Sequence, residues 1–232
     1  MRPLLLLHGA LGGPDTLQPL AALLQDEFAV HCPAFPGHAA APATEYRMEE
    51  LVDFLAEYLN RKGLERPLVF GYSMGGYAAL ALAARAPGRL GAVATLATKL
   101  HWTPEGAARE ARMLQPDTIE AKVPAFAAAL ARRHAPLDWK AVVAGTAALM
   151  QDLGETPLLT AEQYRRISDP VLLLLGDRDG MASIEETRDA FTQISGAQLG
   201  LLPGTPHPLE KVPVELLAAL LRHFLKTVPH EH

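Results

Sequence analysis

Two hydrophobic patterns alternate along the first hundred residues. Short, unbroken apolar runs bounded by proline, glycine or polar residues predict strands buried on both faces of a sheet. These runs span residues 4–7, 28–32, 68–70 and 92–96. Stretches with apolar residues three and four positions apart predict amphipathic helices. They span residues 15–24, 47–61 and 75–85. We expect Asp15 or Thr16 to cap the first helix and Gly63 to end the second.

The alternation stops after Thr98 and resumes near residue 170. Further strands are predicted at 170–175 and 197–202, and further helices at 183–194 and 212–225. The regular order of strands and helices with short links predicts right-handed crossovers and a parallel sheet. We therefore expect an α/β core.

Residues 99–166 carry no strand signal and are predicted to form several short amphipathic helices. We interpret 99–166 as a helical lid, and residues 1–98 together with 167–232 as the core. The expected helix breakers are Pro104, Pro116, Pro124, Pro136, Gly145, Gly154 and Pro157. The apolar side chains of the lid are expected mostly to pack together, with a few facing a pocket. They include Trp102, Met113, Leu114, Phe126, Leu130, Trp139, Leu149 and Met150.

A strand run is joined to a helix through Gly71-Tyr72-Ser73-Met74-Gly75. This Gly-x-Ser-x-Gly pattern between a strand and a helix is typical of a nucleophilic serine on a sharp turn. Glycines without Cβ atoms let the strand and the helix pass close together. The serine also lies at a helix N-terminus, where free N–H groups favour negative charge. Ser73 is therefore the candidate nucleophile.

A serine hydroxyl needs a base, and the base needs an orienting acid. The strand at 170–175 ends in Gly176-Asp177-Arg178-Asp179, and we favour Asp179 as the acid because it lies deeper in the turn. His207 follows the last strand between two prolines that restrict the backbone, so it is the candidate base. The order serine, aspartate, histidine is the order expected after such a serine.

The first strand ends in a glycine-rich loop that begins at His8-Gly9. We expect the backbone N–H groups of Ala10 and Met74 to form the oxyanion hole. Leu11 and Tyr72, next to Ala10 and Ser73, are the candidate substrate-binding residues. His8 is expected to hold the loop through hydrogen bonds rather than to act as a second base.

The composition narrows the class of protein. The 232 residues are 49% hydrophobic and 20% charged, which suits one soluble α/β domain. The net charge of −5 offers no basic surface for nucleic acid. The single cysteine, Cys32, cannot form an internal disulfide. The apolar start is too short for a signal peptide and no run predicts a membrane span, so we expect a cytoplasmic protein.

The histidines and glycines of the chain do not form the usual metal or nucleotide motifs. No two histidines have the spacing of a zinc motif, and no glycine-rich phosphate loop opens a helix. We therefore expect no metal and no cofactor. The remaining histidines receive no functional role: His31, His38, His101, His134, His223 and those at positions 230 and 232.

Five segments carry a resemblance to a known family. They are His8-Gly9-Ala10-Leu11-Gly12-Gly13, Phe35-Pro36-Gly37-His38, Gly71-Tyr72-Ser73-Met74-Gly75-Gly76, Gly176-Asp177-Arg178-Asp179 and Pro203-Gly204-Thr205-Pro206-His207. In these segments the chain resembles the small, lid-bearing serine hydrolases of the α/β-hydrolase fold. The resemblance implies Asp179, the fourth residue of its Gly-x-x-Asp turn, as the acid. It also implies Ala10, the first residue after His-Gly, as an oxyanion donor.

Two departures from the family pattern matter. The sequence starts directly at the strand before the oxyanion loop, so we expect none of the antiparallel strands that often precede it in the family. The 32–39 loop lacks the usual acidic residue and second glycine. The resemblance then implies a doubly wound, mostly parallel six-stranded sheet in the order 2-1-3-4-5-6. Helices would lie on both faces and a helical lid above.

We expect a serine hydrolase that cleaves a small to medium ester or thioester, a small-molecule acyl substrate, through an acyl-enzyme. Serine at position 73 sets the chain apart from relatives with a carboxylate nucleophile. Carbon–carbon bond hydrolysis, lactone opening and elimination chemistry use the same triad and stay open. A non-enzymatic small-molecule receptor on this scaffold is the alternative from another class. The oligomeric state, monomer or homodimer, is also open.

Overall fold

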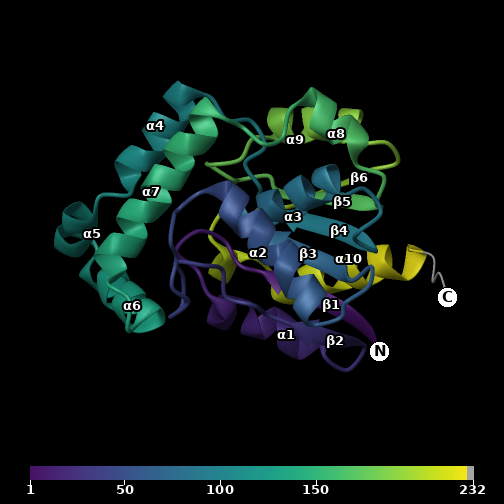
Figure 1. The fold of residues 1–232 in the computed structure, drawn as a ribbon, viewed down its shortest axis with the longest axis horizontal. Helices are drawn as coiled ribbons and strands as arrows, with labels where there is room; N and C mark the ends of the chain where they lie inside the picture. Colours follow the sequence, from purple (N-terminus) through teal and green to yellow (C-terminus); the bar gives the residue numbers. More distant parts are fainter. Residues whose placement is uncertain (229–232) are drawn as a thin grey trace.

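One parallel sheet forms the centre of the molecule (Figure 1). The computed structural model describes residues 1–228, so the histidine-containing end of the chain lies outside the described residues. Within them the strand order is β2-β1-β3-β4-β5-β6. The strands are β1 (Arg2–Leu7), β2 (Phe28–His31), β3 (Leu68–Tyr72), β4 (Ala92–Leu96), β5 (Val171–Gly176) and β6 (Gln198–Leu202). Every neighbouring pair is parallel, which confirms the predicted fold class and strand order.

Helices cover both faces of the sheet because alternate side chains of each strand point to opposite faces. The helices of the core are α1 (Gln18–Leu24), α2 (Met48–Arg61), α3 (Met74–Arg85), α8 (Ala161–Arg166), α9 (Ile184–Gln193) and α10 (Val214–Thr227). Leu5 and Leu7 of β1 pack in one apolar cluster with α2, α3, α8 and α9, whereas Leu4 and Leu6 pack in a second cluster with α1 and α10. Two short 3-10 helices, η1 (Pro14–Leu17) and η2 (Leu209–Lys211), complete the core.

The start of the first helix differs from the prediction. A 3-10 turn, η1, begins at Pro14 and leads directly into α1, and neither Asp15 nor Thr16 caps α1. Proline already supplies the backbone angle of a first helical position, so the turn begins before either residue. The Thr16 hydroxyl donates to the Gly13 carbonyl at 2.6 Å, and Asp15 forms an ion pair with Arg133. The end of α2 follows the prediction, with Gly63 at φ 61°.

Between β4 and β5 the chain is helical. Four helices form a layer beyond one edge of the sheet (Figure 1): α4 (Pro104–Met113), α5 (Pro116–Lys122), α6 (Pro124–His134) and α7 (Trp139–Glu155). We call α4–α7 the helical segment. Three of its helices begin at a proline, in the first helical position where the missing N–H costs nothing. The last helix before β5, α8, packs against α3 and α9 of the core rather than with this segment.

Two glycines expected to break helices do not. Gly145 and Gly154 both lie inside the 17-residue helix α7. A Cβ on Gly145 would lie 2.4 Å from the Tyr46 ring, and one on Gly154 would lie 2.5 Å from Ala107 of α4. Both glycines therefore serve close packing of α7 against its neighbours, which outweighs their weak preference for helix.

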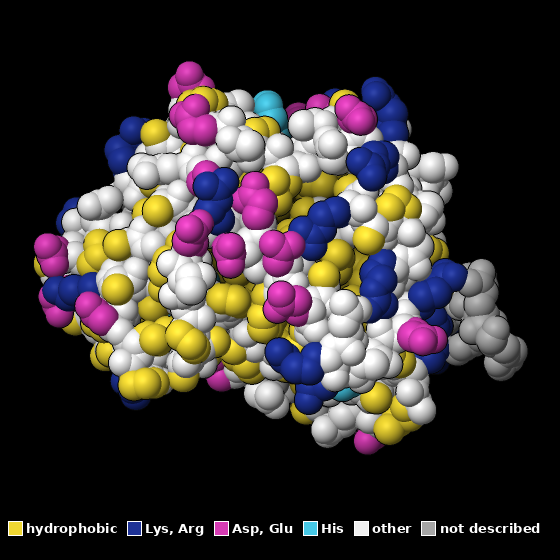
Figure 2. Space-filling model, in the orientation of Figure 1, with side chains coloured by type: hydrophobic (Ala, Val, Ile, Leu, Met, Phe, Trp, Pro, Cys, Tyr) yellow, Lys and Arg dark blue, Asp and Glu magenta, His cyan; other side chains and the backbone are white. Residues whose placement is uncertain are grey.

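Charge on the molecular surface is unevenly spread. Figure 2 shows acidic side chains gathered over the middle of one face, near α2, with basic side chains toward the side that carries the chain ends. Among residues 1–228, no helix is both long and apolar enough to cross a membrane.

Candidate active site

Ser73 lies at the point where β3 turns into α3. Its backbone has φ 50° and ψ −115°, a left-handed conformation that costs about 1–3 kcal/mol for a non-glycine residue. The Ser73 N–H donates to the Leu96 carbonyl of β4 at 2.8 Å, which holds the turn against the sheet. The strain is thus stabilised by the surrounding sheet, as expected for a serine that must project from a tight turn.

Two glycines make this turn possible. A Cβ on Gly71 would lie 2.4 Å from the Gly76 nitrogen, so strand and helix meet backbone to backbone. A Cβ on Gly75 would lie 2.5 Å from the Leu7 carbonyl oxygen, so α3 also abuts the end of β1. The close approach inferred from Gly-x-Ser-x-Gly is therefore present, and it includes the neighbouring strand as well.

Asp179 and His207 face each other across two loops. Nδ1 of His207 lies 3.0 and 2.9 Å from the two carboxylate oxygens of Asp179. The Asp179 carboxylate also accepts hydrogen bonds from the N–H groups of Met181 and Ala182. Burial opposes ionisation of Asp179, but the bonds from His207 and the two amides outweigh it, so its pKa lies below its usual value. A buried, ionised carboxylate is therefore fixed against one imidazole nitrogen.

The other aspartate of this turn has a different environment. Asp177 accepts a hydrogen bond from the Thr205 N–H at 3.3 Å and lies 4.0 Å from the Arg178 guanidinium. It therefore ties the β5 turn to the loop before His207 without contacting the imidazole. Of the two carboxylates in the sequence motif, only Asp179 meets His207.

His207 is also held through its backbone. The Tyr72 hydroxyl, on the residue before Ser73, donates to the His207 carbonyl at 2.8 Å. The two rings lie 5.6 Å apart between centroids. Tyr72, predicted to bind substrate, thus positions the loop that carries the imidazole.

The candidate oxyanion donors lie on either side of Ser73. Met74 is the first residue of α3, and N–H groups in the first turn have no acceptor within their own helix. Ala10 lies in a turn closed by the Gly12 N–H and the Gly9 carbonyl at 3.1 Å. Both residues line the cavity next to Ser73. This arrangement leaves their amides suited to a developing negative charge.

His8 holds the base of this turn. Nδ1 of His8 donates to the Gly9 carbonyl at 2.8 Å, and Nε2 accepts from the Phe35 N–H at 3.1 Å. Both contacts require the neutral ring, and burial lowers the pKa of His8 to about 4. The side chain thus has the loop-holding contacts expected from the sequence.

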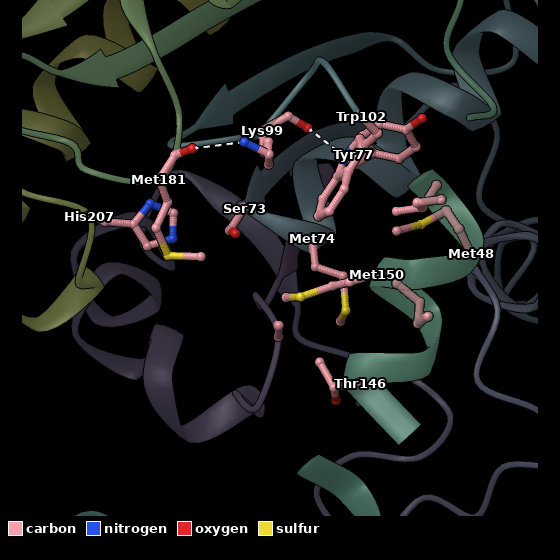
Figure 3. A pocket seen from close by; sticks show the side chains of 13 residues that line it. Met48, Ser73, Met74, Tyr77, Lys99, Trp102, Thr146, Met150, Met181 and His207 are labelled. Carbon is pink, nitrogen blue, oxygen red and sulfur yellow. Dashed lines mark hydrogen bonds between the residues drawn. The ribbon is translucent and has the colours of Figure 1, made fainter. Parts of the chain in front are cut away.

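A narrow cavity of about 30 Å³ borders Ser73, and we call it the slot. Figure 3 shows Ser73 and His207 on one side of the slot and Met48 and Trp102 on the other. Four of the chain's six methionines line it: Met48, Met74, Met150 and Met181. Methionine is flexible and polarizable, so these walls can adapt to an apolar group.

A larger cavity of about 760 Å³ lies beside the slot, and we call it the side cleft. It is bounded by α1, α6, α10 and the 207–210 loop. Ala10 and His207 line both cavities, whereas Leu11 and Tyr72 line the side cleft only. The two predicted substrate-binding residues therefore lie next to the slot rather than in it. Most of the Leu11 side chain packs with apolar residues of α5, α6 and α7.

Several residues at the site carried no signal in the sequence. Lys99, just after β4, lines the slot, donates to the Met181 carbonyl at 3.2 Å and lies 3.7 Å from Glu110. His134, given no role from the sequence, bridges two loops beside Ala10. Its Nε2 donates to the Leu11 carbonyl at 3.2 Å, and its Nδ1 accepts from the Ala39 N–H at 3.0 Å. The contacts of Lys99 and of His134 both depend on packing of the helical segment, which no local sequence pattern encodes.

Comparison with known proteins agrees with this architecture. A family profile described as "alpha/beta hydrolase fold" matches residues 2–150. The chain belongs to the α/β-hydrolase family. It is 30% identical over 207 residues to a pimeloyl-acyl-carrier protein methyl ester esterase of Aromatoleum aromaticum, covering 86% of this chain and 80% of that protein. The expected hydrolase class is thereby confirmed.

Two solved structures share the fold of this α/β hydrolase. A thermophilic esterase from Thermogutta terrifontis matches with a TM-score of 0.79 and 23% identity, covering 98% of this chain and 90% of that one. The enol-lactonase from Burkholderia xenovorans LB400 matches with a TM-score of 0.78 and 22% identity, covering 97% and 91%. At these identities the likeness extends to the fold alone. In the described part of the chain, no cluster of three or more His, Cys, Asp or Glu is arranged to hold a metal ion.

Proposed function

We propose that this α/β hydrolase cleaves a small to medium ester or thioester through Ser73, His207 and Asp179. The observation that carries the proposal is the pair of contacts, 3.0 and 2.9 Å long, between His207 Nδ1 and Asp179. His207 lines the same slot as Ser73, which lies on its strained turn. The ester chemistry named for the Aromatoleum relative adds support.

In the proposed mechanism, Ser73 Oγ attacks the substrate carbonyl carbon while its proton passes to His207. The carbonyl oxygen becomes an oxyanion that accepts hydrogen bonds from the Ala10 and Met74 amides, each worth about 3 kcal/mol of barrier. The bond to the leaving group then breaks, and its oxygen or sulfur takes the proton from His207. Water, deprotonated by His207, releases the acid from Ser73 by the same steps in reverse. Asp179 orients the imidazole throughout and stabilises its charged form.

The helical segment acts as a lid in this proposal. Leu149, Met150 and Leu153 of α7 line the slot that Ser73 also borders. An apolar wall excludes water from the acyl-enzyme and strengthens hydrogen bonds to the oxyanion. The predicted lid, residues 99–166, includes α8, which packs on the core, so the part proposed to cover the site is α4–α7.

Hydrolysis of p-nitrophenyl esters from acetyl to octanoyl tests the proposal. Wild-type protein should release p-nitrophenol from at least the shorter esters, and Ser73→Ala should reduce kcat by about 10³-fold or more. Turnover by wild type no faster than by Ser73→Ala across the series would sink the esterase proposal. Tight ligand binding without turnover would instead favour the receptor alternative.

A further inference from the structure

The two cavities at the site differ in which candidate catalytic groups they touch. Ala10 and His207 border both, so the slot and the side cleft meet where a scissile bond would lie. Ser73 and Met74 border the slot but not the side cleft. The cavities also differ in size, at about 30 and 760 Å³. The site is therefore asymmetric about the candidate nucleophile.

The chemistry of acyl transfer assigns one half of a substrate to each cavity. The acyl group stays bonded to Ser73 Oγ while its oxygen contacts the Met74 amide, so it must occupy the cavity that touches both residues. The leaving group takes the proton that His207 received from Ser73 and then departs, so it must lie within reach of the imidazole, on the opposite side of the scissile bond from the acyl group. These requirements place the acyl group in the slot and the leaving group in the side cleft.

The walls of the side cleft indicate what kind of group fits it. Leu20, Leu209, Val214 and Leu217 supply apolar surface, and Phe126 of α6 reaches it from the helical segment. Arg133 also lines the side cleft, and its guanidinium forms an ion pair with Asp15, with Nε and a carboxylate oxygen 3.0 Å apart. This pairing leaves one negative charge on the lining, that of the exposed Glu210, which disfavours an anionic ligand. A cavity of this size suits a bulky, mainly apolar group.

The small size of the slot limits the acyl group. At about 30 Å³ against about 760 Å³, the slot is much the smaller cavity, so we expect it to take a short acyl group such as acetyl. Longer acyl chains require the methionine side chains to move, which they can do at some cost.

We propose that the side cleft is the leaving-group site, and that the substrate is a short-chain acyl ester of a bulky, mainly apolar alcohol or thiol. This inference rests on the proposed ester hydrolysis and narrows it. It reverses the arrangement of a methyl ester of a large acid, in which the small group would be the one that leaves.

Two isomeric esters test the assignment on the wild-type protein. 2-Phenylethyl acetate places the bulky group on the alcohol, and methyl 3-phenylpropanoate places it on the acid. We expect kcat/KM for the acetate to exceed that for the methyl ester by about tenfold or more. Equal values, or preference for the methyl ester, would overturn the inference while leaving ester hydrolysis intact. Failure to hydrolyse even p-nitrophenyl acetate would overturn the proposed function itself.

A matched pair of variants on α6 tests the location. Ala129 is half-buried and lines the side cleft, whereas its neighbour Ala128 is exposed and lines neither cavity. Ala129→Trp should fill the cleft and lower kcat/KM for 2-phenylethyl acetate by about tenfold, with methyl acetate changed by less than about twofold. Ala128→Trp should leave both values unchanged. An equal loss on both acetates in Ala129→Trp, or no loss on either, would contradict the assignment. The isomer comparison stands even if this variant does not fold.

Discussion

The candidate acid–base pair and the candidate oxyanion loop are held in different ways. The turn after β5 and the loop after β6 are tied to each other within the core: Arg178 N–H donates to the Thr205 carbonyl at 3.1 Å, and Thr205 N–H donates to Asp177. The oxyanion loop instead bonds to the helical segment, because Arg133 and His134 of α6 both donate to the Leu11 carbonyl at 3.2 Å. In the proposed mechanism, proton transfer would thus depend on the core, whereas stabilisation of the oxyanion would depend also on α6.

Buried histidines form the link on the oxyanion side. His8, His38 and His134 are each fully buried, with ring centroids 5.3 Å apart for the first two and 5.7 Å apart for the last two. They connect the loop after β1, the 35–41 turn and the end of α6. The acid–base side contains one imidazole, that of His207, and it faces the slot. Movement of α6 is therefore expected to reach the oxyanion amides before it reaches the base.

The largest effect should come from the acid–base side. Asp179→Asn should lower kcat by about 10³–10⁴-fold, because the amide no longer stabilises the charged imidazole and favours the wrong tautomer. Asp177→Asn is the matched control in the same turn and should retain activity within about threefold, since Asp177 bonds only backbone and Arg178. Steady-state kinetics on p-nitrophenyl acetate measure both. Full activity in Asp179→Asn together with loss in Asp177→Asn would reverse the assignment of the acid.

A smaller effect should come from the link to α6. His134→Leu removes the donor to Leu11 and the acceptor from Ala39, so the Ala10 amide shifts and kcat should fall by about tenfold, or about 1.4 kcal/mol. KM should change little, because the slot walls are intact. Arg132→Leu, an exposed change two residues earlier, is the control. An equal loss of kcat in the control, or none in His134→Leu, would break the proposed contrast between the two loops.

The histidine link should also make stability depend on pH. Burial lowers the pKa of His8 to about 4 and that of His38 to about 3, from an ordinary value of 6.5. The unfolded chain therefore binds more protons than the folded chain, and stability is lost as pH falls from about 6.5 toward 4. Urea unfolding at pH 7.0 and pH 4.5 should show a loss of a few kcal/mol.

A single substitution tests whether the buried rings cause that loss. His38→Phe should lower the pH-dependent part of the loss, since a neutral ring replaces one that must stay unprotonated. His223→Asn, at an exposed position on α10, should leave the pH dependence as in wild type. If the pH dependence of stability is the same in all three proteins, the buried histidine rings do not cause the loss of stability in acid.

The smallest effect should come from the Tyr72 hydroxyl, which ties the His207 loop to the residue before Ser73. Tyr72→Phe removes the 2.8 Å bond to the His207 carbonyl and should lower kcat by about three- to fivefold, which corresponds to about 1 kcal/mol. Tyr58→Phe, whose hydroxyl lies 3.4 Å from His31 on another part of the surface, is the control and should be unchanged. Unaltered kcat in Tyr72→Phe would show that the loop holds His207 without it.

The sequence was sufficient for the sheet because its signals are local. The apolar runs predict the strands to within two residues, and the strand-end motifs bring Asp179 to His207 and Ser73 to the same edge. Where a side chain's surroundings come from distant packing, local signals fail. Gly145 lies in α7 because Tyr46 packs against it, and His134 contacts Leu11 only because α6 crosses that loop. The walls that α7 contributes to the slot are a further example, because they too are set by packing between distant segments.

The place where the helical segment enters and leaves the sheet has an evolutionary consequence. Strands β4 and β5 pair directly, with Leu96 opposite Leu174, and the Ala97 N–H donates to the Leu174 carbonyl at 3.0 Å. Exit and return points are thus fixed side by side by hydrogen bonds that do not involve the intervening helices. We therefore expect the strands to keep their register when the length or sequence of the inserted helices changes. If the helical segment covers the site as proposed, evolution could alter the substrate by replacing one continuous stretch of coding sequence.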